Sequence, residues 1–142
     1  MRMSGPAEWF PKLAPHNHKV TSPVDQRYNC IAWAYGKDDL WFWPDADSYW
    51  PPEISRVEEI QAFVALYSRL GYEVCADGEL TSGFEKVTIY CDEAGKPTHA
   101  ALQLPNGMWA SKCGCWHDIE HELDALNGSL YGKPTVFMSR PR

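Results

Sequence analysis

The chain has 142 residues, of which 44 % are hydrophobic and 23 % charged, which matches one folded domain and excludes a disordered chain. Its formal net charge is −6 and it contains no basic run, so we expect no binding to nucleic acid. No apolar stretch approaches the roughly 20 residues of a membrane span, and the first residues lack the apolar core of a secretory signal. We therefore expect no membrane association and a cytoplasmic location, with delivery by a dedicated secretion system left open.

Two parts are predicted along the chain. Residues 1–21 are rich in proline and show little periodicity, which predicts an arm on the surface, and residues 22–142 are expected to form the folded domain. The sequence contains no internal repeat.

A short helix is predicted near the start of that domain. Ser22 followed by Pro23 has the chemistry of a helix start, and Asn29 offers a second start directly before Cys30. Gly36 supplies the end of the helix. If Asn29 is the N-cap, Cys30 lies in the first helical turn.

A loop and a longer helix come next. Residues 40–50, the aromatic loop, contain three tryptophans and a tyrosine, which predicts either a lid of core aromatics or the wall of a groove. Ser55 and Glu58 have the spacing of a capping box, and an apolar face at helical spacing continues to Gly71. This second helix is expected to be structural.

The remaining segments predict strands and one late helix. The strands are expected in "YEVCA", "FEKVTIYCD", "THAALQL", "MWASK" and "TVFMSR", with Asn106-Gly107 as the turn of a hairpin, and the late helix at 118–126. Because helices come first and antiparallel strands follow, we predict an α+β fold in which N-terminal helices pack on an antiparallel sheet.

Cys30 is the strongest candidate for chemistry. A helix N-terminus stabilises a thiolate, and a histidine within hydrogen-bond reach completes a nucleophile and base pair. His99 is the best candidate for that base because it stands near the start of a predicted strand. The backbone N–H of Cys30 and the side chain of Asn29 or Gln26 are candidate oxyanion donors, although Asn29 can equally serve as the helix cap.

The blocks "NCIAWA", "GFEKV", "PTHAA" and "DIEH" are similar to those of a bacterial domain family of unknown function. The order of "YNCIAWA" and "THAALQLPNGMWASK" also resembles small papain-like cysteine hydrolases, and the second block resembles transglutaminase-like domains. This resemblance implies a papain-like fold. It also implies a cysteine hydrolase or acyl transferase acting on an amide, isopeptide or glutamine side chain of a protein or peptide substrate, without a cofactor.

The third member of such a catalytic set stays open. If Asn106-Gly107 is a two-residue turn, Lys112 projects to the same sheet face as His99 and Ser111 projects away. Asp118 approaches from the start of the next element. Asp118, Lys112 and Ser111 are therefore the candidates for an orienting residue.

Two alternatives to the catalytic hypothesis remain. Cys30 fits equally well as a buried small residue of an apolar helix. The domain is then a non-catalytic protein-binding module that uses the aromatic loop. For a substrate groove, the candidate walls are Trp33, Trp41, Trp43 and Trp109. A zinc-stabilised domain is the weaker alternative, with the candidate ligands Cys113, Cys115, His117 and His121.

Overall fold

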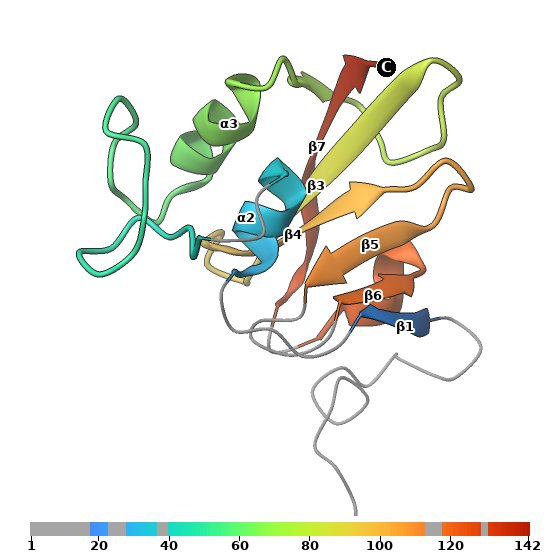
Figure 1. Ribbon diagram of the computed structural model, residues 1–142, viewed down its shortest axis with the longest axis horizontal. Coiled ribbons are helices and arrows are strands. Elements are labelled where there is room, and N and C mark those ends of the chain that lie inside the picture. The colour runs from blue at the N-terminus through green and yellow to red at the C-terminus, as the bar shows by residue number, and fades with distance from the viewer. Residues whose placement is uncertain (1–17, 23–27, 37–39, 113–117, 129–130) are drawn as a thin grey trace, which may run out of the picture.

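The computed structural model describes residues 18–22, 28–36, 40–112, 118–128 and 131–142, with backbone only for residues 18–22 and Asp118. Its main element is one sheet of seven strands in the order β1-β6-β5-β4-β3-β7-β2, and neighbouring strands pair antiparallel throughout (Figure 1). The strands are β1 His18–Ser22, β2 Glu73–Cys75, β3 Phe84–Cys91, β4 Pro97–Gln103, β5 Trp109–Lys112, β6 Asp118–His121 and β7 Lys133–Pro141.

Helix α2, Cys30–Tyr35, confirms the short helix predicted from the sequence. Asn29 is its N-cap, since the side chain accepts a hydrogen bond from the N–H of Ala32. Gly36 ends the helix in the left-handed conformation, at φ 96°. Cys30 is therefore the first helical residue. Ser22, the alternative helix start, is the last residue of strand β1, and Pro23 lies outside the described residues.

Helix α3, Ile60–Ser68, begins later than the capping box predicts. Its N-cap is Glu59, which makes no side-chain capping bond, and the segment around Ser55 and Glu58 is not helical. Ser55 instead uses its backbone carbonyl to accept a hydrogen bond from the indole of Trp50. Ser55 and Glu58 have the spacing of a capping box, but the backbone of Ser55 is hydrogen-bonded to Trp50 of the preceding loop, and the helix begins only at Ile60.

The sheet has two buried faces, because successive strand residues point to opposite sides. One face, the helix face, is covered by α2 and α3 and contains Val87, Ile89, Ala100 and Met138. The other face, the η1 face, is covered by the 3₁₀ helix η1, Leu123–Leu126, and contains Tyr90, Ala101, Trp109 and Ile119. Figure 1 shows α2 next to β4 and α3 to the left of β3 and β7.

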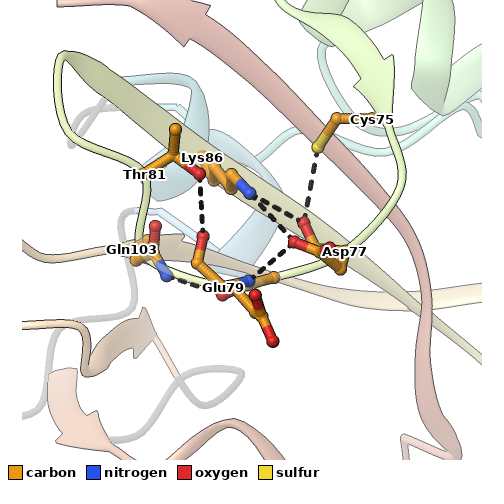
Figure 2. A network of polar contacts seen from close by, with 7 residues as sticks. Cys75, Asp77, Glu79, Thr81, Lys86 and Gln103 are labelled. Atoms are coloured by element: carbon orange, nitrogen blue, oxygen red, sulfur yellow. Dashed lines mark hydrogen bonds and ion pairs between the residues drawn. The ribbon is translucent and has the colours of Figure 1, made fainter.

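The loop between β2 and β3 is fastened to the η1 face by two buried polar side chains (Figure 2). The ammonium of Lys86 donates to the backbone carbonyl and the carboxylate of Asp77, at 3.0 and 3.3 Å. The amide of Gln103 donates to the carbonyl of Gly78 at 2.8 Å. Gly78 is required there, because a Cβ would lie 2.7 Å from the ring of Phe137.

The predicted papain-like α+β fold is wrong. The chain is mainly an antiparallel sheet, and among the described residues only α3 exceeds six residues as a helix. The helix predicted at 118–126 is also wrong, since β6 pairs with β5 and β1 and only η1 follows it. Strand β6 is hydrogen-bonded along both of its edges, to β1 and to β5, and this pairing outweighs the local helical pattern of the segment.

Strand β1 lies across the predicted boundary between arm and domain, and pairs with β6 at the edge of the sheet. The rest of the predicted arm, residues 1–17, lies outside the described residues. No helix in the described part of the chain is long and apolar enough to cross a membrane.

Candidate functional site

The first turn of α2 is tied to the aromatic loop through one buried side chain, Asn29. Its carbonyl oxygen accepts the N–H groups of Ala32 and Phe42, each at 3.1 Å, and its amide donates to the carbonyl of Phe42 at 2.6 Å. The same side chain therefore caps the helix and fixes the loop. This confirms the capping interpretation of Asn29, and the oxyanion role stays a prediction.

The aromatic loop is held in one conformation by backbone and side-chain contacts. Phe42 and Tyr49 form a parallel bridge across its base. The guanidinium of Arg56 donates to three carbonyls of the loop, those of Asp45, Ser48 and Trp50. These contacts present the loop as a preformed surface.

A cavity of about 270 Å³ lies between this loop, the start of α2 and the start of β4; we call it the Cys30 pocket. Its walls are Asn29, Cys30, Trp41, Trp43, Asp45, Thr98 and Tyr131. The structure thus brings together four residues expected at a site, Cys30, Asn29, Trp41 and Trp43. The pocket is smaller than the roughly 300–1,000 Å³ of drug-sized ligand sites, so it suits a single side chain or similarly small group.

Cys30 forms part of this wall as a neutral thiol. Burial raises the pKa of Cys30 to about 11, which outweighs the lowering by backbone hydrogen bonds from Ala100, Ile31 and Cys30 itself and by the charge of Lys112. The helix N-terminus does act in the direction expected for a nucleophile. Desolvation is the larger effect, so the side chain stays protonated at neutral pH.

His99 does not meet Cys30, because the two side chains lie on opposite faces of the sheet. Ala100, which belongs to the helix face, lies against Cys30. His99 precedes it by one residue and therefore points to the η1 face, where it pairs across the strands with Tyr90. The predicted Cys30–His99 pair is not formed.

His99 is fully buried between aromatic rings. Its ring stacks on Tyr131 with centroids 4.0 Å apart, and contacts Tyr90 edge-on at 5.0 Å. Neither ring nitrogen has a hydrogen-bond partner within the described part of the chain. Burial, and secondarily the nearby His121, hold the pKa of His99 well below its usual value. His99 is therefore neutral at pH 7.

Ser111 and Lys112 lie on the faces opposite to those predicted. Ser111 lies on the η1 face, where its hydroxyl is 2.7 Å from Nε2 of His121. Nδ1 of His121 lies 2.7 Å from the carbonyl of Glu122, so it carries the proton and Nε2 accepts from the hydroxyl. This is a serine–imidazole pair, but both side chains are fully buried. Lys112 lies on the helix face, with its ammonium 5.1 Å from the ring centroid of Tyr28.

The remaining predicted site residues do not join the pocket. Trp33 packs against the core of the helix face, and Trp109 lies on the η1 face beside Phe137. Asp118 begins β6, and its side chain lies outside the described residues, as does Gln26. The proposed zinc ligands Cys113, Cys115 and His117 lie outside them too, and the described residues contain no group of three or more metal-ligating side chains.

Sequence reasoning missed three residues of the pocket wall, Asp45, Thr98 and Tyr131. Asp45 stood inside the predicted aromatic loop, so an acidic residue between tryptophans was the available signal. No sequence signal marked Thr98 or Tyr131, because the two residues are far apart in the sequence and come together only when the sheet forms. The hydroxyl of Thr98 lies 2.5 Å from the carbonyl of Tyr131 and 3.2 Å from that of Tyr90, so its single hydrogen serves these two acceptors.

A larger cavity of about 810 Å³ lies at the turn between β3 and β4, lined by Cys91, Asp92, Glu93, Ala94, Gly128, Gly132 and Lys133. It adjoins residues 129–130, which lie outside the described residues, and none of the predicted site residues lines it. The Cys30 pocket is therefore the candidate site.

Comparison with known proteins gives a family and no activity. No curated protein and no solved structure matches the chain, so nothing here supports the papain-like resemblance or a bacterial origin. One family model matches residues 19–139, and its description is "Domain of unknown function (DUF7689)". Because the match covers most of the 142 residues, the chain belongs to this DUF7689 family.

Proposed function

We propose that this domain is a non-catalytic binding module that holds a segment of a protein or peptide against the aromatic loop and the Cys30 pocket. The observation that carries the proposal is the exposure of large apolar side chains on a loop whose backbone is fixed. Leu40, Trp41 and Tyr49 are 38 %, 38 % and 43 % exposed. Clustered apolar exposure of this kind marks interaction sites.

The fixed shape of the loop favours binding. Ordering a flexible loop on association costs free energy, and a loop already held by Asn29 and Arg56 avoids most of that cost. Exposed tryptophan and tyrosine side chains are also the residues that most often dominate the energy of protein interfaces. A partner segment would lie on Trp41 and Tyr49 and insert one side chain into the pocket.

The second candidate is a cysteine hydrolase or acyl transferase, which is favoured by one observation, the position of Cys30 in the wall of the pocket. Two features weigh against it. The thiol has a raised pKa, and His99 and His121 both lie on the opposite face. We rank it below binding for these reasons. An activity lost in Cys30→Ala but retained in Cys75→Ala is what this candidate requires.

A peptide library displayed on phage and selected against the full chain tests the binding proposal. We expect enriched sequences whose affinity falls about tenfold or more in Trp41→Ala and in Tyr49→Ala. Val74→Ala is the matched control, because Val74 is 63 % exposed on edge strand β2, away from the loop. Selection without enrichment, or an equal loss of affinity in Val74→Ala, contradicts the proposal.

A further inference from the structure

We infer that the side chain taken into the Cys30 pocket is cationic, a lysine or arginine of the bound segment. This inference rests on the proposed function and names the chemistry that the same site recognises. It follows from the charges, the aromatic walls and the hydrogen-bonded polar groups of the pocket.

Asp45 is the one charged residue among the described residues of the pocket wall. One of its carboxylate oxygens accepts the N–H of Asp47 at 3.0 Å, which orients the group, and the other makes no hydrogen bond within the described part of the chain. Cys30 adds no charge because its thiol stays protonated at neutral pH. The wall therefore presents a single negative charge, in a chain whose net charge is −6.

Two indole rings complete the walls beside that carboxylate. Trp41 is 38 % exposed, and Trp43 is fixed by an edge-on contact with Phe63, with centroids 5.4 Å apart. Tryptophan gives the strongest attraction for cations among aromatic side chains. An acid beside two tryptophans is accordingly a site for an alkylammonium or guanidinium group.

The described residues of the wall include no cationic side chain, and cationic groups are what carboxylates and phosphates bind most strongly. One N–H of the Asn29 amide donates to the carbonyl of Phe42, and the single hydroxyl hydrogen of Thr98 is taken up by backbone carbonyls. Two nearby cations are also committed. Arg56 donates to loop carbonyls, and Lys112 places its ammonium against Tyr28 without lining the pocket.

The test compares two probes with the same alkyl chain length. One is Nα-acetyl-lysine methylamide, which keeps the side-chain ammonium, and the other is the uncharged Nα-acetyl-norleucine methylamide. Binding is followed by NMR from the indole N–H signals of Trp41 and Trp43, which are assigned with Trp41→Phe and Trp43→Phe. We expect saturable shifts with the lysine probe and about tenfold weaker binding of the norleucine probe, from one cation–π contact and one exposed ion pair.

Asp45→Asn is the decisive variant, because it removes the charge and keeps the oxygen that accepts from Asp47. We expect it to weaken the lysine probe several-fold and leave the norleucine probe unchanged. Asp47→Asn is the matched control, since Asp47 is an exposed neighbour that does not line the pocket. An equal effect of the two variants overturns the inference.

The failure of this inference is distinguishable from that of the proposed function. If norleucine binds as tightly as lysine, the pocket is apolar, the inference is overturned and the binding proposal stands. If neither probe shifts either indole, the inference is overturned as well, and the peptide selection decides the binding proposal independently.

Discussion

Cys30 and His99 lie on opposite faces of one sheet, although Ala100, the neighbour of His99, lies against Cys30. The alternation of side chains along β4 places residue 100 under helix α2 and residue 99 against Tyr90 and Tyr131. The predicted cysteine at a helix start and histidine at a strand start are thus both present. They are kept apart because the side chain of His99 points to the sheet face opposite to the one that carries helix α2. That separation leaves Cys30 without His99 as a base, which favours a binding pocket over a catalytic pair.

Asn29→Ala is expected to lower the free energy of unfolding by about 2–4 kcal/mol, because it removes a helix cap and leaves the buried N–H and carbonyl of Phe42 without partners. Asn29→Ser keeps a hydroxyl that can cap the helix and removes the contacts with Phe42, so we expect a smaller loss. Urea denaturation followed by circular dichroism measures both. Equal losses in the two variants would show that the cap and the loop anchor are not separate contributions.

The short helix was predictable because its signals are local. Asn29 and Gly36 each act within one helical turn, and both do what their position in the sequence indicates. The strands from β2 to β5 and β7 were predictable for the same reason, from alternation and turn residues.

The faces of Ser111 and Lys112 were not predictable, because they depend on a register that differs by one residue. The hairpin closes with the N–H of Leu104 donating to the carbonyl of Met108, which leaves a three-residue turn that ends at Gly107 with φ 88°. A two-residue turn had been expected. A shift of one residue in the register turns every side chain of the following strand to the other face of the sheet, so Ser111 and Lys112 lie on the faces opposite to those predicted.

His99 is expected to make the domain less stable as the pH falls below about 6.5. Burial lowers the pKa of His99 in the folded state, so below its ordinary pKa only the unfolded chain takes up the proton, and folding loses up to about 1.4 kcal/mol per pH unit. His99→Phe keeps the aromatic stack on Tyr131 and removes this titration. We therefore expect the stability difference between wild type and variant to change between pH 6.5 and 4.5.

The measurement is urea denaturation of both proteins across that pH range, with the difference between the two curves as the readout. Subtraction removes the titration of carboxylates common to both chains. Parallel curves would contradict the neutral, buried state of His99.

Gly78→Ala is expected to destabilise the domain by about 1–3 kcal/mol, because the added methyl group would lie 2.7 Å from Phe137 and 3.1 Å from Trp109. Phe137→Leu should relieve part of that cost, so the double variant should lose less than the sum of the single losses. Thermal unfolding of the four proteins measures the coupling. A neutral Gly78→Ala would contradict the close approach of this loop to the η1 face.

Alkylation of Cys30 by iodoacetamide as a function of pH tests most directly the central claim that Cys30 is a neutral part of the pocket wall and not one half of a catalytic thiolate–imidazolium pair. Modification is quantified by mass spectrometry of the peptide that contains Cys30, with circular dichroism to verify that the chain stays folded. We expect half-maximal reactivity near pH 11, unchanged in His99→Ala. Reactivity that is half-maximal below about pH 7.5 and moves to higher pH in His99→Ala would contradict it and favour a thiolate–imidazolium pair.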